Sequence, residues 1–195
     1  HAGYRAQARR ITQAVAERYG QHPAVAAWQT DNEFGCHDTA ISFSDAAVAG
    51  FRAWLAVRYG TVEALNQAWG TVFWSQEVRS FDDISLPHQT VTEANPSQRL
   101  DFQRYSSWAV ARFQEDQYRL LKFLSPGRPV SHNFMGFYTG FNHHDVSRHL
   151  DIATWDSYPL GFTQDFFFSA AEKVHYARSG HPDVPAFHHD LYRGM

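Results

Sequence analysis

The sequence has very little cysteine, with Cys36 as the single thiol among 195 residues. One thiol excludes a disulfide within the chain and is typical of a reducing compartment, which predicts a cytoplasmic protein. The chain also lacks any apolar run of the roughly 20 residues that a transmembrane helix needs, so we expect no segment to cross a membrane. Lys and Arg are scattered, and the formal net charge is −3. This charge pattern argues against a nucleic-acid partner and indicates a neutral substrate.

The strongest local signal is an apolar run, 25–28, that ends abruptly in polar residues. We expect this run to be a short buried strand, because it is too short for a helix. A carboxylate just after a strand, here Glu33, is typical of the active sites of α/β barrels. Asn32 and Glu33 would point to opposite faces of a regular strand, so the chain should leave extended geometry there, which Gly35 permits. The alternative is that Glu33 is a solvated loop carboxylate.

Two further apolar runs also end in polar residues. A strand predicted to begin at 129–131 ends at His132 and Asn133, and the strand at 152–155 leads to Asp156. Apolar spacing and capping residues predict helices at 4–20, 45–59, 61–69, 95–124 and 163–180, with N-caps at Asp45, Thr61, Asn95 and Thr163. Alternating helices and strands indicate a parallel α/β fold. The long segment 37–95 should then be an insertion on the face that binds substrate.

Motifs in several separate parts of the chain resemble the β-galactosidases of glycoside hydrolase family 42. They lie at 28–39, 59–61, 68–76, 133–136 and 155–159. The resemblance implies a (β/α)8 TIM barrel, of which this chain covers roughly helix 3 to the segment before strand 7. The chain would then be a partial catalytic domain, 1–195, with a helical insertion at about 37–95 after strand 4 and no second domain. It begins without Met and is shorter than the roughly 250 residues of a complete barrel, so we expect a piece of a longer enzyme.

The resemblance also assigns roles to individual residues. It makes Glu33 the general acid/base of a retaining mechanism, with Asn32 beside it as a substrate-binding residue. It places Trp74 and Tyr158 in the galactose site, where an aromatic ring packs on the apolar face of a sugar. The alternative for Trp74 is a loop anchor, and for Tyr158 a ring packed under its loop with its hydroxyl bonded locally.

Nothing in the chain predicts a metal or another cofactor. Many members of the family carry zinc-binding cysteines shortly after the Asn-Glu motif, whereas this chain has Ser42, Phe43 and Ser44 there. A histidine group at His143, His144 and His149 lacks zinc-finger spacing, and we expect solvated loop histidines. The tail, which contains His188, His189 and Asp190, lacks a nucleophile on a strand-to-helix elbow and is interpreted as structural support.

A retaining mechanism needs a second carboxylate, and no other Glu ends a predicted strand. By resemblance the nucleophile should end strand 7, within about 15 residues beyond Met195 if the spacing of βα units holds. The rival within the chain is Asp156, at the end of strand 6. We therefore expect residues 1–195 alone to be inactive.

The predicted substrate is a small β-galactoside such as lactose or a galacto-oligosaccharide, and the resemblance implies a homotrimer. Two alternatives stay open at this point. One is another barrel glycosidase, of the arabinosidase or β-mannosidase type, since contacts to single hydroxyls separate these sugars. The other is a non-catalytic carbohydrate-binding barrel that uses Trp74 and the aromatic segment 134–141 for stacking.

Overall fold

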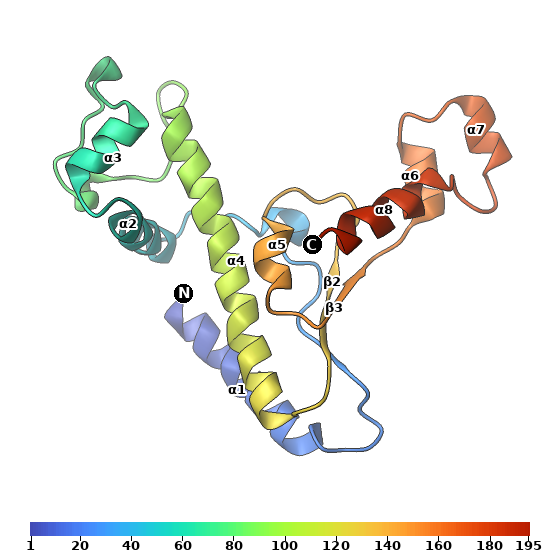
Figure 1. Ribbon diagram of the computed structural model, residues 1–195. Helices are drawn as coiled ribbons and strands as arrows, with labels where there is room; N and C mark the ends of the chain where they lie inside the picture. Colours follow the sequence, from blue (N-terminus) through green and yellow to red (C-terminus); the bar gives the residue numbers. More distant parts are fainter.

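The computed structural model describes all 195 residues and shows a mixed α/β chain with a small sheet at its centre (Figure 1). The strands are β1 (Trp28–Gln29), β2 (Val130–Phe134) and β3 (Ile152–Trp155). The helices are α1 (Ala2–Tyr19), α2 (Asp45–Tyr59), α3 (Val62–Trp69), α4 (Pro96–Leu124), α5 (His143–Ser147), α6 (Pro159–Asp165), α7 (Ala170–His175) and α8 (Asp183–Arg193). Short 3-10 helices cover Cys36–Asp38, Phe73–Ser75 and Phe81–Asp83. None of the helices combines the length and apolarity that a membrane crossing requires.

The three strands run parallel in the order β1-β2-β3, as the alternation of strands and helices predicts. In this register Trp28 lies opposite Val130. Pairing continues past β1, because the backbone N–H of Glu33 donates to the carbonyl of Asn133 at 2.9 Å. The carboxyl ends of the strands therefore meet at one edge of the sheet.

The first strand is later and more exposed than the sequence predicts. We expected a buried strand at 25–28, but β1 consists of Trp28 and Gln29, and neither is buried. Val25 lies in a turn instead, where its N–H donates to the carbonyl of His22 at 3.0 Å. β1 also has β2 as its single neighbour, so its other edge is open.

Helix α4 is the longest element and connects the sheet to a separate helical lobe (Figure 1). It begins where the sequence predicts, because the Asn95 side chain accepts the N–H groups of the first turn and Pro96 occupies the first helical position. Its C-terminal half packs against α1 and β2, where Ala16, Leu121 and Val130 form a small buried core. This packing holds α1 and β2 against the same helix, α4.

The insertion expected at 37–95 contributes α2 and α3 to the helical lobe, which the first half of α4 completes (Figure 1). Its own core has nine buried residues: Ala47, Phe51, Leu55, Leu65, Trp69, Ile84, Leu86, Phe102 and Tyr105. Thr61 caps α3 as predicted. The predicted cap at Asp45 is wrong by one residue, because Ser44 has the extended backbone and its hydroxyl accepts the N–H of Ala47 at 3.3 Å.

The helix predicted at 163–180 is wrong. Pro159 starts a helix four residues earlier, and the chain breaks before Ser169 caps a second one. Thr163 is buried within α6, where its hydroxyl donates to the carbonyl of Pro159 at 2.6 Å and accepts the N–H of His181 at 2.7 Å. Thr163 therefore ties α6 to the segment before α8 instead of capping a helix.

The prediction of solvated loop histidines is wrong for His143. Its ring packs against Phe134, Phe141 and Tyr192, and its Nε2 is buried without a hydrogen-bond partner. This burial lowers the pKa of His143, which favours the neutral imidazole. Local patterns could not predict this burial, because Phe134 lies in β2 and Tyr192 in α8.

A buried carboxylate, Asp101, holds the helical lobe together. It accepts hydrogen bonds from the Tyr59 hydroxyl at 2.5 Å and the Trp69 indole at 2.9 Å. The Arg104 guanidinium lies 3.1 Å away, and the Asp101 side chain is 2% exposed. Asp101 thus connects α2, α3 and α4 through one anion.

We expect Asp101→Asn to lower the free energy of unfolding by about 1.5–3 kcal/mol, because buried donors then lose a charged acceptor. Urea unfolding of the variant and the unmodified protein measures this difference. Asp82→Asn is the matched control, because Asp82 is exposed and should leave stability unchanged. Equal stability of both variants would show that the Asp101 contacts contribute nothing.

Candidate active site

The site lies where the ends of β1, β2 and β3 meet. Glu33 follows β1, Asn133 lies in β2, and Asp156 follows β3. The backbone N–H of Asp156 donates to the carbonyl of Phe134 at 2.8 Å. Asp156 and Glu33 are therefore both bound to β2 through their backbones. Three segments far apart in the sequence therefore bring their polar side chains to one place.

The chain leaves extended geometry after β1, as predicted. Asp31 and Glu33 have φ values of 44° and 48°, and Gly35 has a φ of 87°. A non-glycine residue in this region costs on the order of 1–3 kcal/mol, which the surrounding contacts must offset. Gly35 also makes room for a neighbour, because a Cβ there would lie 2.2 Å from the Tyr138 hydroxyl. The turn allows Asn32 and Glu33 to share one site although they are adjacent.

A chain of amide and carboxylate contacts links the predicted site residues. The two protons of the Asn133 side-chain amide go to Asn32 Oδ1 at 2.9 Å and to Asp156 Oδ1 at 2.7 Å. The Tyr158 hydroxyl donates to Asp156 Oδ2 at 3.1 Å. The structure thus brings Asn32, Glu33 and Tyr158 together, with Asn133 and Asp156 between them.

Glu33 and Asp156 form a pair of carboxyl groups whose pKa values move in opposite directions. The hydrogen bond with Asp156 raises the pKa of Glu33, and burial and the Asp156 charge raise it further. In the same contact the pKa of Asp156 is lowered by the hydrogen bond with Glu33 and by that from Asn133. A hydrogen bond from Cys36 acts in the opposite direction on Glu33 without reversing the shift. Of the two carboxyl groups, Glu33 is therefore the one that loses its proton at the higher pH.

A buried histidine, His132, packs against the turn that carries Glu33 and hydrogen-bonds to its backbone. Its Nδ1 lies 2.7 Å from the Thr30 carbonyl, and its Nε2 accepts the backbone N–H of Phe34 at 3.2 Å. These partners place the proton on Nδ1, and burial lowers the pKa of His132 so that the ring stays neutral. The ring also stacks on Phe34 with centroids 4.0 Å apart. Sequence reasoning missed His132, although its place before Asn133 at a strand end was a usable signal.

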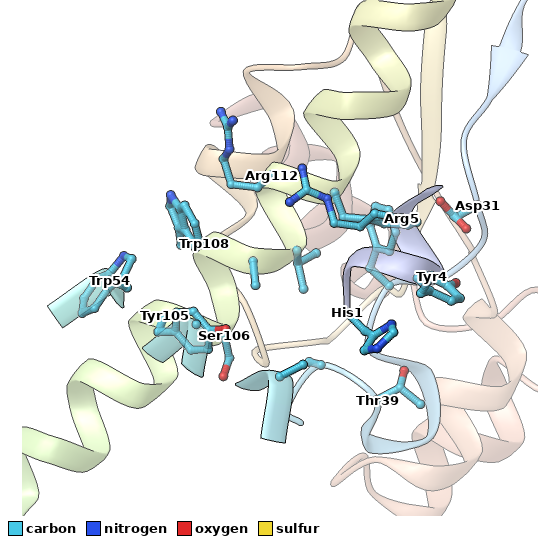
Figure 2. A pocket seen from close by; sticks show the side chains of 18 of the residues that line it. His1, Tyr4, Arg5, Asp31, Thr39, Trp54, Tyr105, Ser106, Trp108 and Arg112 are labelled. Atoms are coloured by element: carbon cyan, nitrogen blue, oxygen red, sulfur yellow. The ribbon is translucent and has the colours of Figure 1, made fainter. Parts of the chain in front are cut away.

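A groove of about 880 Å³ extends from the site between α1, α2 and α4. Asp31, Asn32 and Glu33 belong to its lining. Figure 2 shows Trp54 and Trp108 on one side of the groove and Arg5 on the other. The site is therefore open to solvent along a partly aromatic surface.

Trp74 is not brought to the strand ends within this chain. It lies in the 3-10 helix after α3, in the helical lobe, with 67% of its surface exposed. Its ring stacks on Phe73 with centroids 4.9 Å apart. Its role in substrate binding stays a prediction.

Residues 42–44, where many members of the family carry zinc-binding cysteines, do not offer ligands for a zinc ion. Ser42 and Ser44 hydrogen-bond each other through their hydroxyl groups at 3.0 Å, and Ser44 also caps α2. Phe43 stacks on His88 with centroids 4.5 Å apart. No group of three or more His, Cys, Asp or Glu side chains is arranged to hold a metal ion.

Comparison with known proteins gives a consistent result. The chain matches the family model Glyco_hydro_42, described as Beta-galactosidase, over residues 1–195. It is 55% identical over 192 residues to a β-galactosidase from Thermus thermophilus, which covers 98% of this chain and 30% of that protein.

Two solved structures are similar to this chain over nearly all of its length. A β-galactosidase from the psychrophilic Marinomonas ef1 has a TM-score of 0.94 at 58% identity, covering 100% of this chain and 30% of that one. A β-galactosidase from the Antarctic haloarchaeon Halorubrum lacusprofundi has a TM-score of 0.93 at 44% identity, covering 99% and 29%. The chain thus spans about 30% of the length of these relatives.

We expect the purified protein to contain no stoichiometric zinc, because Ser42, Phe43 and Ser44 offer no thiolate or imidazole. Elemental analysis measures the zinc content, and thermal unfolding with and without a chelator measures its effect on stability. A melting temperature that does not move with the chelator is the expected result. One zinc ion per chain whose removal lowers the melting temperature would prove the prediction wrong.

Proposed function

Because this chain belongs to glycoside hydrolase family 42, the β-galactosidase family, we propose that the protein hydrolyses terminal β-D-galactosyl residues with retention of configuration. The observation that carries the proposal is the strand-end geometry, in which the backbones of Glu33 and Asp156 are bound to neighbouring carbonyls of β2 and Glu33 lines the groove. The contact with Asp156 raises the pKa of Glu33, and a carboxyl group with a raised pKa beside a groove is suited to general acid catalysis. A non-catalytic carbohydrate-binding barrel has no need of such a group.

Glu33 acts twice in the proposed reaction. As an acid it protonates the leaving glycosidic oxygen while a second carboxylate attacks the anomeric carbon. As a base it then takes a proton from the water that releases galactose from the enzyme. The raised pKa suits the first step, and the loss of the nucleophile's charge in the intermediate suits the second.

The remaining predicted residues supply contacts to the sugar. Asn32 lies beside Glu33 with its amide directed by Asn133 and Gln29, so its orientation is fixed before substrate arrives. Tyr158 presents an exposed ring and keeps its hydroxyl on Asp156. We assign Trp74 a stacking role on the strength of the family motif. The identities of the relatives favour a galactoside over an arabinoside or a mannoside.

The hydrogen bond through which Asp156 raises the pKa of Glu33 argues against Asp156 as the nucleophile. The two carboxylates of a retaining glycosidase stand about 5–5.5 Å apart, with the sugar between them. Asp156 is instead in direct hydrogen-bond contact with Glu33. The (β/α)8 barrel proposed for the whole enzyme supplies the nucleophile from strand 7, and residues 1–195 alone should not turn over substrate. A cytoplasmic homotrimer stays a prediction.

In the full-length enzyme, Glu33→Ala should reduce hydrolysis of lactose by about 10²–10⁴-fold, because its leaving group needs protonation. An activated aryl galactoside should lose much less in its first step. Azide should restore turnover with a β-galactosyl azide as product, since a small anion needs no general base. Equal losses on both substrates together with no azide product would remove Glu33 from this role.

A fluorosugar that traps the glycosyl-enzyme identifies the nucleophile by peptide mapping. We expect the label on a Glu outside residues 1–195, because Asp156 cannot stand across the sugar from Glu33. A label on Asp156, or hydrolysis by this chain alone, would refute the assignment.

A further inference from the structure

Asp156 takes no chemical step in the proposed reaction, yet both of its oxygens are engaged. Oδ1 accepts a proton of the Asn133 amide at 2.7 Å, and Oδ2 accepts the Tyr158 hydroxyl at 3.1 Å. The same carboxylate shares a hydrogen bond with Glu33. One anion thus contacts three neighbouring polar side chains of the site.

We propose that Asp156 is a positioning residue for Glu33: its carboxylate, held by Asn133 and Tyr158, accepts the proton-bearing oxygen of Glu33 and fixes that proton before substrate binds. The inference deepens the proposed function and rests on it. The two neutral donors stabilise the charge on Asp156, so the proton of the pair stays on Glu33.

The backbone keeps this contact in place. Glu33 and Asp156 follow β1 and β3, which flank β2, and both are hydrogen-bonded through their N–H groups to carbonyls of β2. Their side chains therefore meet over the end of β2, where Asn133 lies between Asn32 and Asp156. Rigid elements on both sides hold the pair in one geometry, which a positioning role requires.

The charges that face Glu33 come from two segments. Asp156 and Tyr158 approach from the end of β3, and Cys36 and His37 belong to the segment of Glu33 itself. Asp156 raises the pKa of Glu33, whereas Cys36 and His37 lower it. Loss of the Asp156 charge should therefore lower the pKa of Glu33, so that Glu33 gives up its proton at a lower pH.

The test is the pH dependence of kcat/KM for lactose in the full-length enzyme, because this ratio reports the acid of the free enzyme. In Asp156→Asn the alkaline limb should move down by about 0.5–1 pH unit. This is less than the 1–3 units typical of close charges, since Glu33 is partly solvated. Asp156→Glu, which keeps a carboxylate, should bring the limb back towards its original position.

The matched control is Asp190→Asn, which removes an equal charge from an exposed carboxylate in α8. The alkaline limb of the kcat/KM profile of this variant should stay in place. A folded Asp156→Asn enzyme with an unmoved limb overturns the inference, even where activity falls equally at every pH, because that result describes a merely structural residue. If Asp156→Asn does not fold, Asp156→Ser is judged by the same criterion.

Failure of the proposed function has a different signature. An unmodified enzyme that hydrolyses no galactoside, or a Glu33→Ala enzyme with full activity on lactose, refutes the catalytic assignment and with it the positioning role. An active enzyme that depends on Glu33 but not on Asp156 refutes the positioning role alone.

Discussion

The register of three parallel strands determines where the chemistry of this protein lies. Because β1 and β3 both pair with β2, Glu33 and Asp156 are fixed to carbonyls of neighbouring β2 residues and their side chains meet above its end. A slip of one residue in either pair would turn one carboxylate to the other face of the sheet. The contact between Glu33 and Asp156, and the proposed role of each, depend on this register.

Helix α4 stabilises that register from one side. Its buried Gln114 accepts the hydroxyl of Thr30, just after β1, at 2.7 Å and donates to the carbonyl of His149 ahead of β3 at 3.0 Å. The same helix extends into the lobe, where Asp101 joins it to α2 and α3. The strand ends, the groove and the lobe are therefore built on one long helix.

Local patterns were sufficient to predict α1 to α4, because caps such as Thr61 and Asn95 act within a few residues, but they did not predict α5 to α8. They also placed Glu33 at a strand end. They failed where a distant partner decides the outcome: Thr163 is held by the segment before α8, and His143 packs against Tyr192 of α8. The contact between Glu33 and Asp156 belongs to this second group, since it depends on the pairing of β1 with β2, which are about one hundred residues apart in the sequence, and of β2 with β3.

The central claim is that the pKa of Glu33 lies above that of an ordinary glutamate because of its contact with Asp156. Its most direct test is a carbon NMR titration of the Glu33 carboxyl group in the full-length protein, with the signal assigned by its absence in Glu33→Gln. We predict a midpoint above that of an unperturbed glutamate, near 4.3, with Asp156 titrating below its own unperturbed value, near 3.9. A Glu33 carboxyl that ionises at or below the ordinary value would contradict the account.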